Sequence, residues 1–274
     1  VSTLVWGKFL ASWIFAGVAL VLTFPFWLTV NYLGNPDNGV IALGYVGSWV
    51  LAGCMLAISQ TMSALTRNQV IALVLAVIVN FLFFLSGVEY VLGFFRLFAP
   101  TTVVDMVASF SFLIHFGSMT GGLLELRDIV FFSSVIMLFN VTTILVVSFR
   151  TSGTSRWLKS TQAGYYMLFF LLLLSAFAGL NMTANHFLQT RRYDFSEEKL
   201  YTLTPSSRQV LDNLPEPVLA KLYYSPLLGQ RNPEMRLMFD RVRLLLEQFS
   251  KLAPQKFSYK IYNPQPLDDA EDEA

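Results

Sequence analysis

Five ionisable side chains stand in or beside apolar sequence, where a charge is costly to maintain and therefore informative. Glu89 lies near the end of one apolar stretch, His115 lies among Phe and Leu residues, and Glu125, Arg127 and Asp128 precede another apolar stretch. A charged group at membrane depth usually marks a transport pathway, a proton relay or an ion pair. These five residues are therefore candidates for a translocation pathway or for an external element beside it.

Two of these residues also have simpler interpretations. Glu89 lies near the expected outer membrane boundary, where a carboxylate can meet water or a basic partner such as Arg96. A single histidine on an apolar face, such as His115, is more often hydrogen-bonded packing than a ligand or a proton relay. An intramembrane enzyme built on either residue would need a second catalytic group, and the sequence places none beside them.

Motifs for nucleotide or metal chemistry are missing from the sequence. It contains no phosphate loop, no His-Glu-x-x-His, no Gly-x-Ser-x-Gly and no cysteine pair. The single cysteine, Cys54, lies in an apolar stretch, and the net charge of +1 offers no basic surface for nucleic acid. We therefore expect a chain that is not an enzyme and binds no cofactor or nucleic acid. If ATP drives it, another polypeptide binds the ATP.

Five apolar stretches must position the candidate residues. Each is long enough to cross a bilayer, since about 20 helical residues span the hydrocarbon core. Only 12 of the 37 Asp, Glu, Lys and Arg residues lie before residue 191. We therefore expect an α-helical polytopic membrane protein with five transmembrane helices, followed by the start of an α/β soluble domain. The stretches are roughly Val5–Leu33, Val40–Leu65, Val70–Leu92, Ile129–Phe149 and Gly164–Leu188.

Two local features of these stretches predict their geometry. Pro25 predicts a kink in the first helix, because proline lacks the N–H and clashes with the preceding turn. Small residues in the second stretch predict a surface that another helix can approach closely. That helix can belong to this chain or to a second copy. The small residues are Gly44, Ser48 and Ala52, with Gly53 and Ala57 on an adjoining face.

Basic residues in the short loops indicate the orientation, because Lys and Arg near span ends favour the cytoplasm. One group of loops carries five of them and the other group carries two. The start of the chain is therefore expected inside, and both the 94–128 segment and the hydrophilic tail are expected outside. The five are Lys8, Arg67, Arg150, Arg156 and Lys159, and the two are Arg96 and Arg127.

The 94–128 segment is apolar but broken, so it does not fit a continuous spanning helix. Thr102 and Asp105 predict an N-cap and a short helix over about Val103–Phe112. Broken backbone at membrane depth is tolerated only against protein or an aqueous cavity, which indicates a re-entrant or interfacial element. Asp128 then begins the fourth span, where a negative side chain suits the helix dipole. The interruptions are Pro100, Gly117, Gly121 and Gly122.

The tail carries alternating helix and strand patterns. A strand over Val218–Tyr224, an amphipathic helix over Arg236–Leu252 and a strand over Phe257–Tyr262 predict a parallel β-α-β unit. A short helix from Pro205 to about Asn213 is expected before it. Two strands and one crossover helix do not close an α/β core, so the domain is expected to continue past the last residue. Because the chain also begins at a valine, we expect it to be a fragment.

Six motifs occur in one order along the chain. Gly7–Ala11 enters a span, Ser63–Val70 forms a turn, and His115–Asp128 precedes a further span. Three more follow in the tail, at Tyr193–Pro205, Glu216–Ser225 and Ile261–Pro264. In this combination the chain resembles a fusion of two components of the gliding-motility-type ABC transport system, an ABC-2-type permease and its auxiliary extracytoplasmic subunit.

The resemblance implies a domain organisation and a location. Residues 1–150 would be the last four of six permease helices, with an external broken segment at 94–128. Residues 151–190 would be a cytoplasmic linker and the fifth membrane helix, and residues 191–274 the N-terminal part of an extracytoplasmic α/β auxiliary domain. The implied location is the bacterial inner membrane.

The resemblance also implies a function and partners. The chain would be a permease subunit of an exporter or flippase, driven by a cytoplasmic ABC ATPase, embedded in membrane lipid and paired with a second permease copy or a paralogue. Envelope proteins are further possible partners. The expected ATPase contact is the turn of Thr66, Arg67, Asn68 and Gln69 with the residues before Val5, although an ordinary capped turn explains the same residues. The alternative is a non-transporting membrane anchor or scaffold that presents an extracytoplasmic binding domain.

Overall fold

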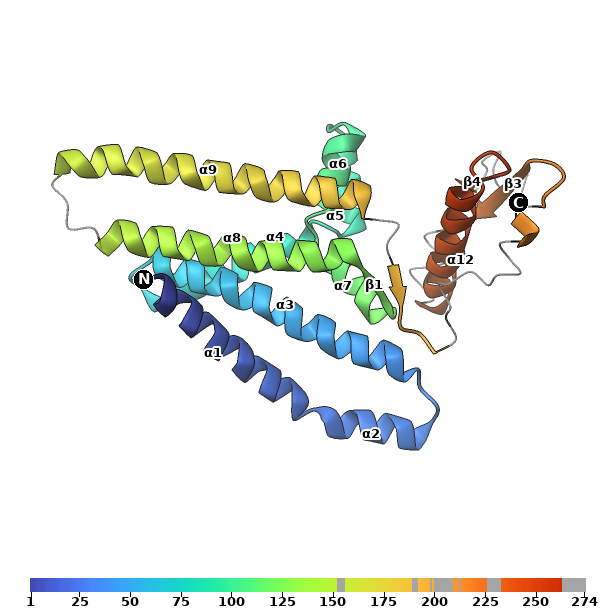
Figure 1. Ribbon diagram of the computed structural model, residues 1–274, viewed down its shortest axis with the longest axis horizontal. Coiled ribbons are helices and arrows are strands. Elements are labelled where there is room, and N and C mark those ends of the chain that lie inside the picture. The colour runs from blue at the N-terminus through green and yellow to red at the C-terminus, as the bar shows by residue number, and fades with distance from the viewer. Residues whose placement is uncertain are drawn as a thin grey trace. The chain divides into compact units, whose positions relative to one another are not determined.

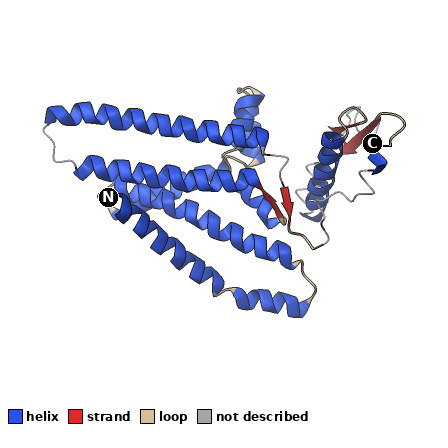
Figure 2. Ribbon diagram, viewed as in Figure 1, coloured by secondary structure: helices blue, strands red, loops and turns tan. Residues whose placement is uncertain are grey.

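The computed structural model describes residues 1–151, 156–188, 192–197, 199, 209–211, 213–225 and 233–262 (Figure 1). The chain divides into two compact units, Val1–Glu197 and Glu198–Ala274. Helices dominate the first unit, and the described residues of each unit include one two-stranded sheet (Figure 2).

Four helical segments of the described chain are long and apolar enough to cross a membrane. A fifth span results if two helices joined by a sharp bend are counted as one. The expectation of a multi-pass helical membrane protein is confirmed at this level. The four segments are Ser2–Leu33, Asn38–Leu65, Leu126–Thr151 and Gly164–Asn185, and the bent pair is Gln69–Leu85 with Tyr90–Arg96.

The first span is kinked, as Pro25 predicts. Two residues separate helix α1 (Ser2–Val21) from helix α2 (Phe24–Leu33), and Pro25 lies in the first turn of α2. Proline is tolerated there because the N–H groups of a first turn have no intrahelical partner. Thr23 lies between the two helices, and its Oγ1 donates a hydrogen bond to the Leu20 carbonyl oxygen of α1 at 2.6 Å.

Helix α3 (Asn38–Leu65) is the central packing element, and its closest contacts run through the face that includes Gly53 and Ala57. A Cβ added at Gly53 would lie 2.8 Å from the Trp13 ring of α1, and Ala57 is completely buried. Gly44, by contrast, has no neighbour within 4 Å. The close-packing surface of α3 is therefore the face of Gly53 and Ala57, and at Gly44 the predicted stripe has open space beside it.

A pair of indole rings joins α1 to α3. Trp13 Nε1 donates to the Trp49 carbonyl oxygen at 2.8 Å, and Trp49 Nε1 donates to the Trp13 carbonyl oxygen at 3.1 Å. The two rings stack with centroids 4.6 Å apart. Both N–H groups are thus satisfied in apolar surroundings, as indoles require.

The third apolar stretch is not a single straight helix. Helix α4 (Gln69–Leu85) is followed by helix α5 (Glu89–Arg96), and the two axes differ by 73°. The turn between them packs against the start of a later helix, since a Cβ at Gly87 would lie 2.1 Å from Ser111 Oγ. The apolar stretch over 70–92 thus contains a bend, which composition does not show because it depends on a tertiary contact.

The broken segment before the fourth span contains two short helices and a strand. The helix predicted over Val103–Phe112 is displaced, because the first helix already begins at Thr101 and Thr102 is not its cap. Ser111 instead caps the second helix, where its Oγ accepts from the Leu113 N–H at 3.1 Å. The elements are α6 (Thr101–Ala108), α7 (Phe112–Thr120) and β1 (Leu123–Glu125).

Helices α8 (Leu126–Thr151) and α9 (Arg156–Phe187) complete the spans of the first unit. Most of the sequence expected as a linker before Gly164 is helical, because residues 156–163 contain no Gly or Pro to end a helix. Asn181 Nδ2 of α9 donates to Ser134 Oγ of α8 at 2.9 Å. Strand β2 (Arg192–Asp194) follows and pairs antiparallel with β1.

Hydrogen bonds and strand pairing hold the helices of the first unit together at two opposite ends. At one end, Gln60 Nε2 donates to the Val5 carbonyl oxygen at 3.1 Å, and Arg150 donates to the Leu65 carbonyl oxygen. These bonds bring together the start of α1 and the C-terminal ends of α3 and α8. The other end holds β1, β2 and the start of α3 (Figure 1). Which end faces the cytoplasm stays a prediction.

The second unit contains the predicted parallel β-α-β arrangement. Strands β3 (Val218–Tyr223) and β4 (Phe257–Tyr262) pair in parallel, and helix α12 (Pro233–Leu252) lies between them in sequence. Phe249 of α12 packs edge-on against Phe257, with ring centroids 5.5 Å apart. Of the short helix predicted before them, Gln209–Leu211 are helical, and residues 201–208 and 212 lie outside the described part.

Candidate functional site: a buried charged cluster beside helix α8

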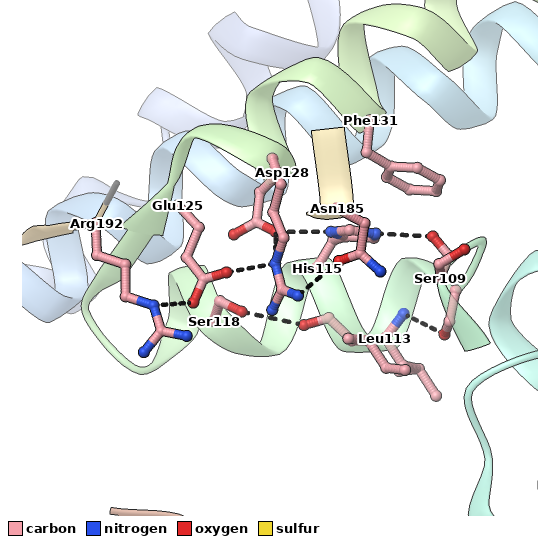
Figure 3. Close-up of polar contacts among 12 residues, drawn as sticks. Ser109, Leu113, His115, Ser118, Glu125, Asp128, Phe131, Asn185 and Arg192 are labelled. Atoms are coloured by element: carbon pink, nitrogen blue, oxygen red, sulfur yellow. Dashed lines mark hydrogen bonds and ion pairs between the residues drawn. The ribbon is translucent and has the colours of Figure 1, made fainter. Parts of the chain in front are cut away.

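Side chains from five elements meet beside the first turn of α8 (Figure 3). Four of the five predicted pathway residues, all except Glu89, are among them. We call this group the charged cluster. Its members are His115 of α7, Glu125 of β1, Arg127 and Asp128 of α8, Asn185 of α9 and Arg192 of β2.

His115 is held on three sides. Its Nδ1 lies 2.6 Å from Asp128 Oδ1, and its Nε2 lies 2.9 Å from the Ser109 carbonyl oxygen. Its ring stacks on Phe131 with centroids 4.1 Å apart. His115 is 5% exposed and Asp128 is 0% exposed, so water does not compete for these bonds. His115 is therefore buried and hydrogen-bonded, and one of its two partners is an acid.

Glu125 forms the charged centre of the cluster. It is 1% exposed and pairs with the guanidinium groups of Arg127 and Arg192, the latter at 2.9 Å from Nε to Oε1. Burial raises the pKa of the Glu125 carboxyl, and the two guanidinium groups oppose that rise. Arg127 Nη1 also donates to Asn185 Oδ1 at 2.9 Å, which extends the cluster to α9. The cluster thus connects the start of α8 to the C-terminal end of α9 and to strand β2.

Backbone contacts reinforce the cluster through residues 192–197, which we call the clamp segment. Glu125 and Arg192 are opposite each other in the β1–β2 pair, and the Phe195 N–H donates to the Gly122 carbonyl oxygen at 3.0 Å. Gly122 has φ +87°, a conformation that favours glycine. The clamp segment therefore lies directly along the turn that leads into α8.

The clamp segment also contacts the start of α3. The Glu197 N–H donates to Asp37 Oδ2 at 3.0 Å, while the Asn38 N–H donates to Glu197 Oε1 at 3.2 Å. Asp37 simultaneously caps α3, since its Oδ1 accepts from the Val40 N–H at 3.0 Å. Gly39 lets the two backbones approach, because a Cβ there would lie 1.8 Å from the Phe195 carbonyl oxygen. The clamp segment thus ties the start of α3 to the turn that leads into α8.

The predicted coupling turn lies at the opposite end of α8 from the cluster. Thr66 Oγ1 donates to the Asn68 carbonyl oxygen at 2.9 Å, and Asn68 Oδ1 accepts from the Val70 N–H at 2.9 Å. Arg67 and Gln69 are exposed. The residues are therefore a capped turn whose charge is open to a partner, and both interpretations of this turn remain compatible with its geometry.

Glu89 stands apart from the cluster as the first residue of α5. Its side chain lies outside the described part of the structure. No group of three or more His, Cys, Asp or Glu side chains in the described residues is arranged to hold a metal ion.

Buried polar side chains inside the helices form a second polar feature. Asn80 of α4 and Asn140 of α8 are 7% and 0% exposed, and each Nδ2 bonds only to its own helix. Neither Oδ1 has a hydrogen-bond partner among the described residues. Thr61 Oγ1 of α3 lies 2.9 Å from Thr143 Oγ1 of α8. The interior of the bundle is therefore partly polar.

Sequence reasoning missed the partners that complete the cluster. Arg192, Asn185 and the Ser109 carbonyl come from segments that the sequence does not connect to α8. Asn185 carried a weak signal, since an amide near the end of an apolar helix commonly bonds to a neighbouring helix. Arg192 was visible only as one of many charges in the tail.

Comparisons with known proteins find a match only in the C-terminal part of the chain. Residues 197–274 match a family model described as a domain of unknown function, DUF7088. The match begins at the last residue of the clamp segment. No curated protein and no solved structure matches the chain significantly.

Proposed function

We propose that this chain is a membrane-spanning permease subunit of an ABC-type exporter or flippase, driven by a separate ATPase and carrying an extracytoplasmic auxiliary domain. The observation that carries the proposal is the fully buried amide of Asn140 in the middle of α8, whose Oδ1 has no partner among the described residues. Polar groups at membrane depth are expensive and are retained where function needs them.

Other polar contacts of α8 support the same role. The hydroxyl pair of Thr61 and Thr143 and the bond from Asn181 to Ser134 connect α8 to α3 and α9. Interhelical hydrogen bonds of this kind are each modest in strength, commonly about 0.6 kcal/mol in membranes. Helices joined by weak, exchangeable bonds can repack around a central path more readily than helices joined by dense apolar packing alone.

The two ends of the bundle fit the proposed coupling. The turn of Thr66–Gln69 presents the exposed Arg67 beside the start of α1, where a motor protein can push. At the other end, the clamp segment ties the same helices to the first residues of the tail. A movement started at the turn would therefore reach the tail through rigid helices.

The test uses the full chain together with the ATPase that co-purifies with it, reconstituted in proteoliposomes. Arg67→Glu is expected to weaken co-purification of the ATPase, because it reverses charge at the proposed contact. Lys199→Glu, the same change of charge on an exposed residue beyond the clamp segment, is the matched control and should leave the complex intact. Equal co-purification of both variants would remove the turn from the mechanism.

Asn140→Leu tests the pathway separately from the contact. It should leave the ATPase bound but alter ATP turnover in the reconstituted complex, because it removes the polar group in the middle of α8. Replacing a buried polar group by an apolar one of similar size has little cost in stability, so a change in turnover would not reflect unfolding. Unchanged turnover would favour the alternative function.

The alternative is a non-transporting anchor or scaffold. The clamp segment is the observation that favours it, because three points of attachment would hold the first residues of a binding domain in a fixed position on the membrane helices. In that case no ATPase should co-purify, and the Asn140→Leu variant should behave like the unaltered chain in every assay.

A further inference from the structure

The hydrogen bonds around His115 determine how many protons the site must hold. Nε2 faces the Ser109 carbonyl oxygen at 2.9 Å, and a carbonyl oxygen only accepts. Nε2 therefore carries a hydrogen. The protonation of the site then depends on the contact between His115 Nδ1 and Asp128 Oδ1.

That contact requires a second proton. At 2.6 Å, one hydrogen must lie between Nδ1 and Oδ1, either on an imidazolium that faces a carboxylate or on a carboxylic acid that faces a neutral imidazole. If the site lost this proton, the neutral imidazole would have one N–H and could donate either to Asp128 or to the Ser109 carbonyl oxygen, but not to both. The two contacts together can therefore exist only in the protonated site.

The surroundings offer little to replace the proton. Asp128 Oδ2 is buried and has no hydrogen-bond partner among the described residues, and Phe131 covers the imidazole face. Among the described residues, Arg127 is a cation close to the pair, and its Nε lies 3.9 Å from Asp128 Oδ1 while it pairs with Glu125. A buried carboxylate with an unpaired oxygen is costly, so keeping the proton lowers the free energy of the site.

The remaining charged groups act on the site through these neighbours. Glu125 of β1 draws the Arg127 guanidinium toward itself, Arg192 of β2 balances Glu125 from the other side, and Asn185 of α9 accepts from Arg127. None of the three contacts His115 directly in the described structure. Loss of the proton would therefore act first on the two contacts that His115 makes with Asp128 and Ser109.

We propose that His115 and Asp128 form a proton-binding site whose ligand, the proton, lets the imidazole of α7 hold both Asp128 of α8 and the Ser109 carbonyl. Below the pH at which the shared proton leaves, α7 keeps both contacts. As the pH rises through that point, the neutral ring keeps one of them, and α7 opens more readily. The inference goes beyond the proposed function, because the site lies entirely within this chain and needs no ATPase.

Asp128→Asn separates this proposal from simple packing. The asparagine Nδ2 can donate to a neutral imidazole Nδ1 while Nε2 still donates to Ser109, so the contact forms without the second proton. The variant should therefore keep the contact but lose its dependence on pH. His115→Leu removes the contact at every pH and serves as the open reference.

The experiment measures hydrogen exchange of the α7 amides, residues 112–120, in the full chain in nanodiscs from acidic to alkaline pH. After correction for intrinsic exchange, opening should rise roughly 10- to 100-fold in the unaltered chain, as loss of a charge-assisted hydrogen bond predicts. In Asp128→Asn it should stay constant. Equal pH dependence in both proteins, or none in the unaltered chain, would overturn the proposal.

A second measurement keeps the test decisive if Asp128→Asn does not fold. The chain has two histidines, so His186→Gln leaves His115 as the only source of a histidine signal in a ¹⁵N imidazole spectrum. The expected result is one titration that coincides with the opening of α7. An imidazole that does not titrate, or that titrates without any change in α7 exchange, would overturn the proposal.

Discussion

The two ends of α8 hold their charges in opposite ways. At the Asp128 end, charges from several elements are buried and paired with one another. At the Arg150 end, the neighbouring turn exposes Arg67 and Gln69 and is held mainly by caps to backbone. Removing one partner of a buried ion pair is strongly destabilising, whereas an exposed charge contributes little. The Asp128 end is therefore stabilised by its buried ion pairs, and the Arg150 end leaves exposed side chains that a partner can contact.

The largest expected effect comes from breaking the buried end. Glu125→Leu leaves the guanidinium groups of Arg127 and Arg192 without their carboxylate, and breaking a buried pair costs about 3–5 kcal/mol. Thermal unfolding of the full chain in detergent should show this loss as a lower midpoint and a smaller protected fraction of α8 in hydrogen exchange.

A double variant provides the control for this prediction. Glu125→Leu combined with Arg192→Met removes one of the two stranded cations and should recover part of the lost stability, because well-packed apolar side chains replace ion pairs at little cost. If the double variant is as unstable as the sum of both single variants, the charges do not act as a cluster.

The next effect tests the clamp segment without changing any charge. Gly39→Ala places a Cβ 1.8 Å from the Phe195 carbonyl oxygen, so the clamp segment must move, at a cost of about 1–3 kcal/mol. Trypsin should then cleave after Arg192 faster than in the unaltered chain. Gly44→Ala lies in the same helix with nothing within 4 Å, and it should leave cleavage unchanged while stabilising α3 by about 0.4–1 kcal/mol.

A smaller effect is expected from the cap at the exposed end. Asn68→Ala removes the acceptor of the Val70 N–H and should destabilise the start of α4 by about 1 kcal/mol. Hydrogen exchange of the first turn of α4 measures this loss. Asn68→Asp keeps an acceptor at the same position and should retain protection, and equal exchange in the two variants would show that the cap contributes nothing.

The smallest effect sharpens the contrast between the two ends. Arg67→Glu should change the free energy of unfolding by less than about 0.5 kcal/mol, because the side chain is exposed and away from buried features. Its unfolding midpoint in detergent should match that of the unaltered chain. A shift as large as that of Glu125→Leu would mean that the two ends do not differ as described.

Periodicity and composition predicted the elements whose pattern is local. The membrane spans followed from apolar length, the kink from Pro25, and the parallel strands of the tail from the helix between them. The bend after Leu85 did not follow, because it depends on the packing of Gly87 against Ser111 from a later helix. Helix boundaries near Thr101 and Arg156 also shifted, since neither start has a sequence signal that fixes the first residue of the helix.

The candidate site was predictable in its members and not in its connections. His115, Glu125, Arg127 and Asp128 were identified because charge in apolar sequence is rare. The pairing of His115 with Asp128 depends on a reversal of the chain between α7 and α8, which no spacing rule indicates. Arg192 joins them only because β2 pairs with β1 in one register.

The stacked indoles of Trp13 and Trp49 give the molecule a built-in optical probe. Two indoles whose centroids lie 4.6 Å apart in nearly parallel planes couple electronically, and the coupling depends steeply on their separation. Near-ultraviolet circular dichroism of the unlabelled protein should therefore report whether α1 leaves α3. Trp13→Phe would remove this signal while retaining an aromatic ring at the contact.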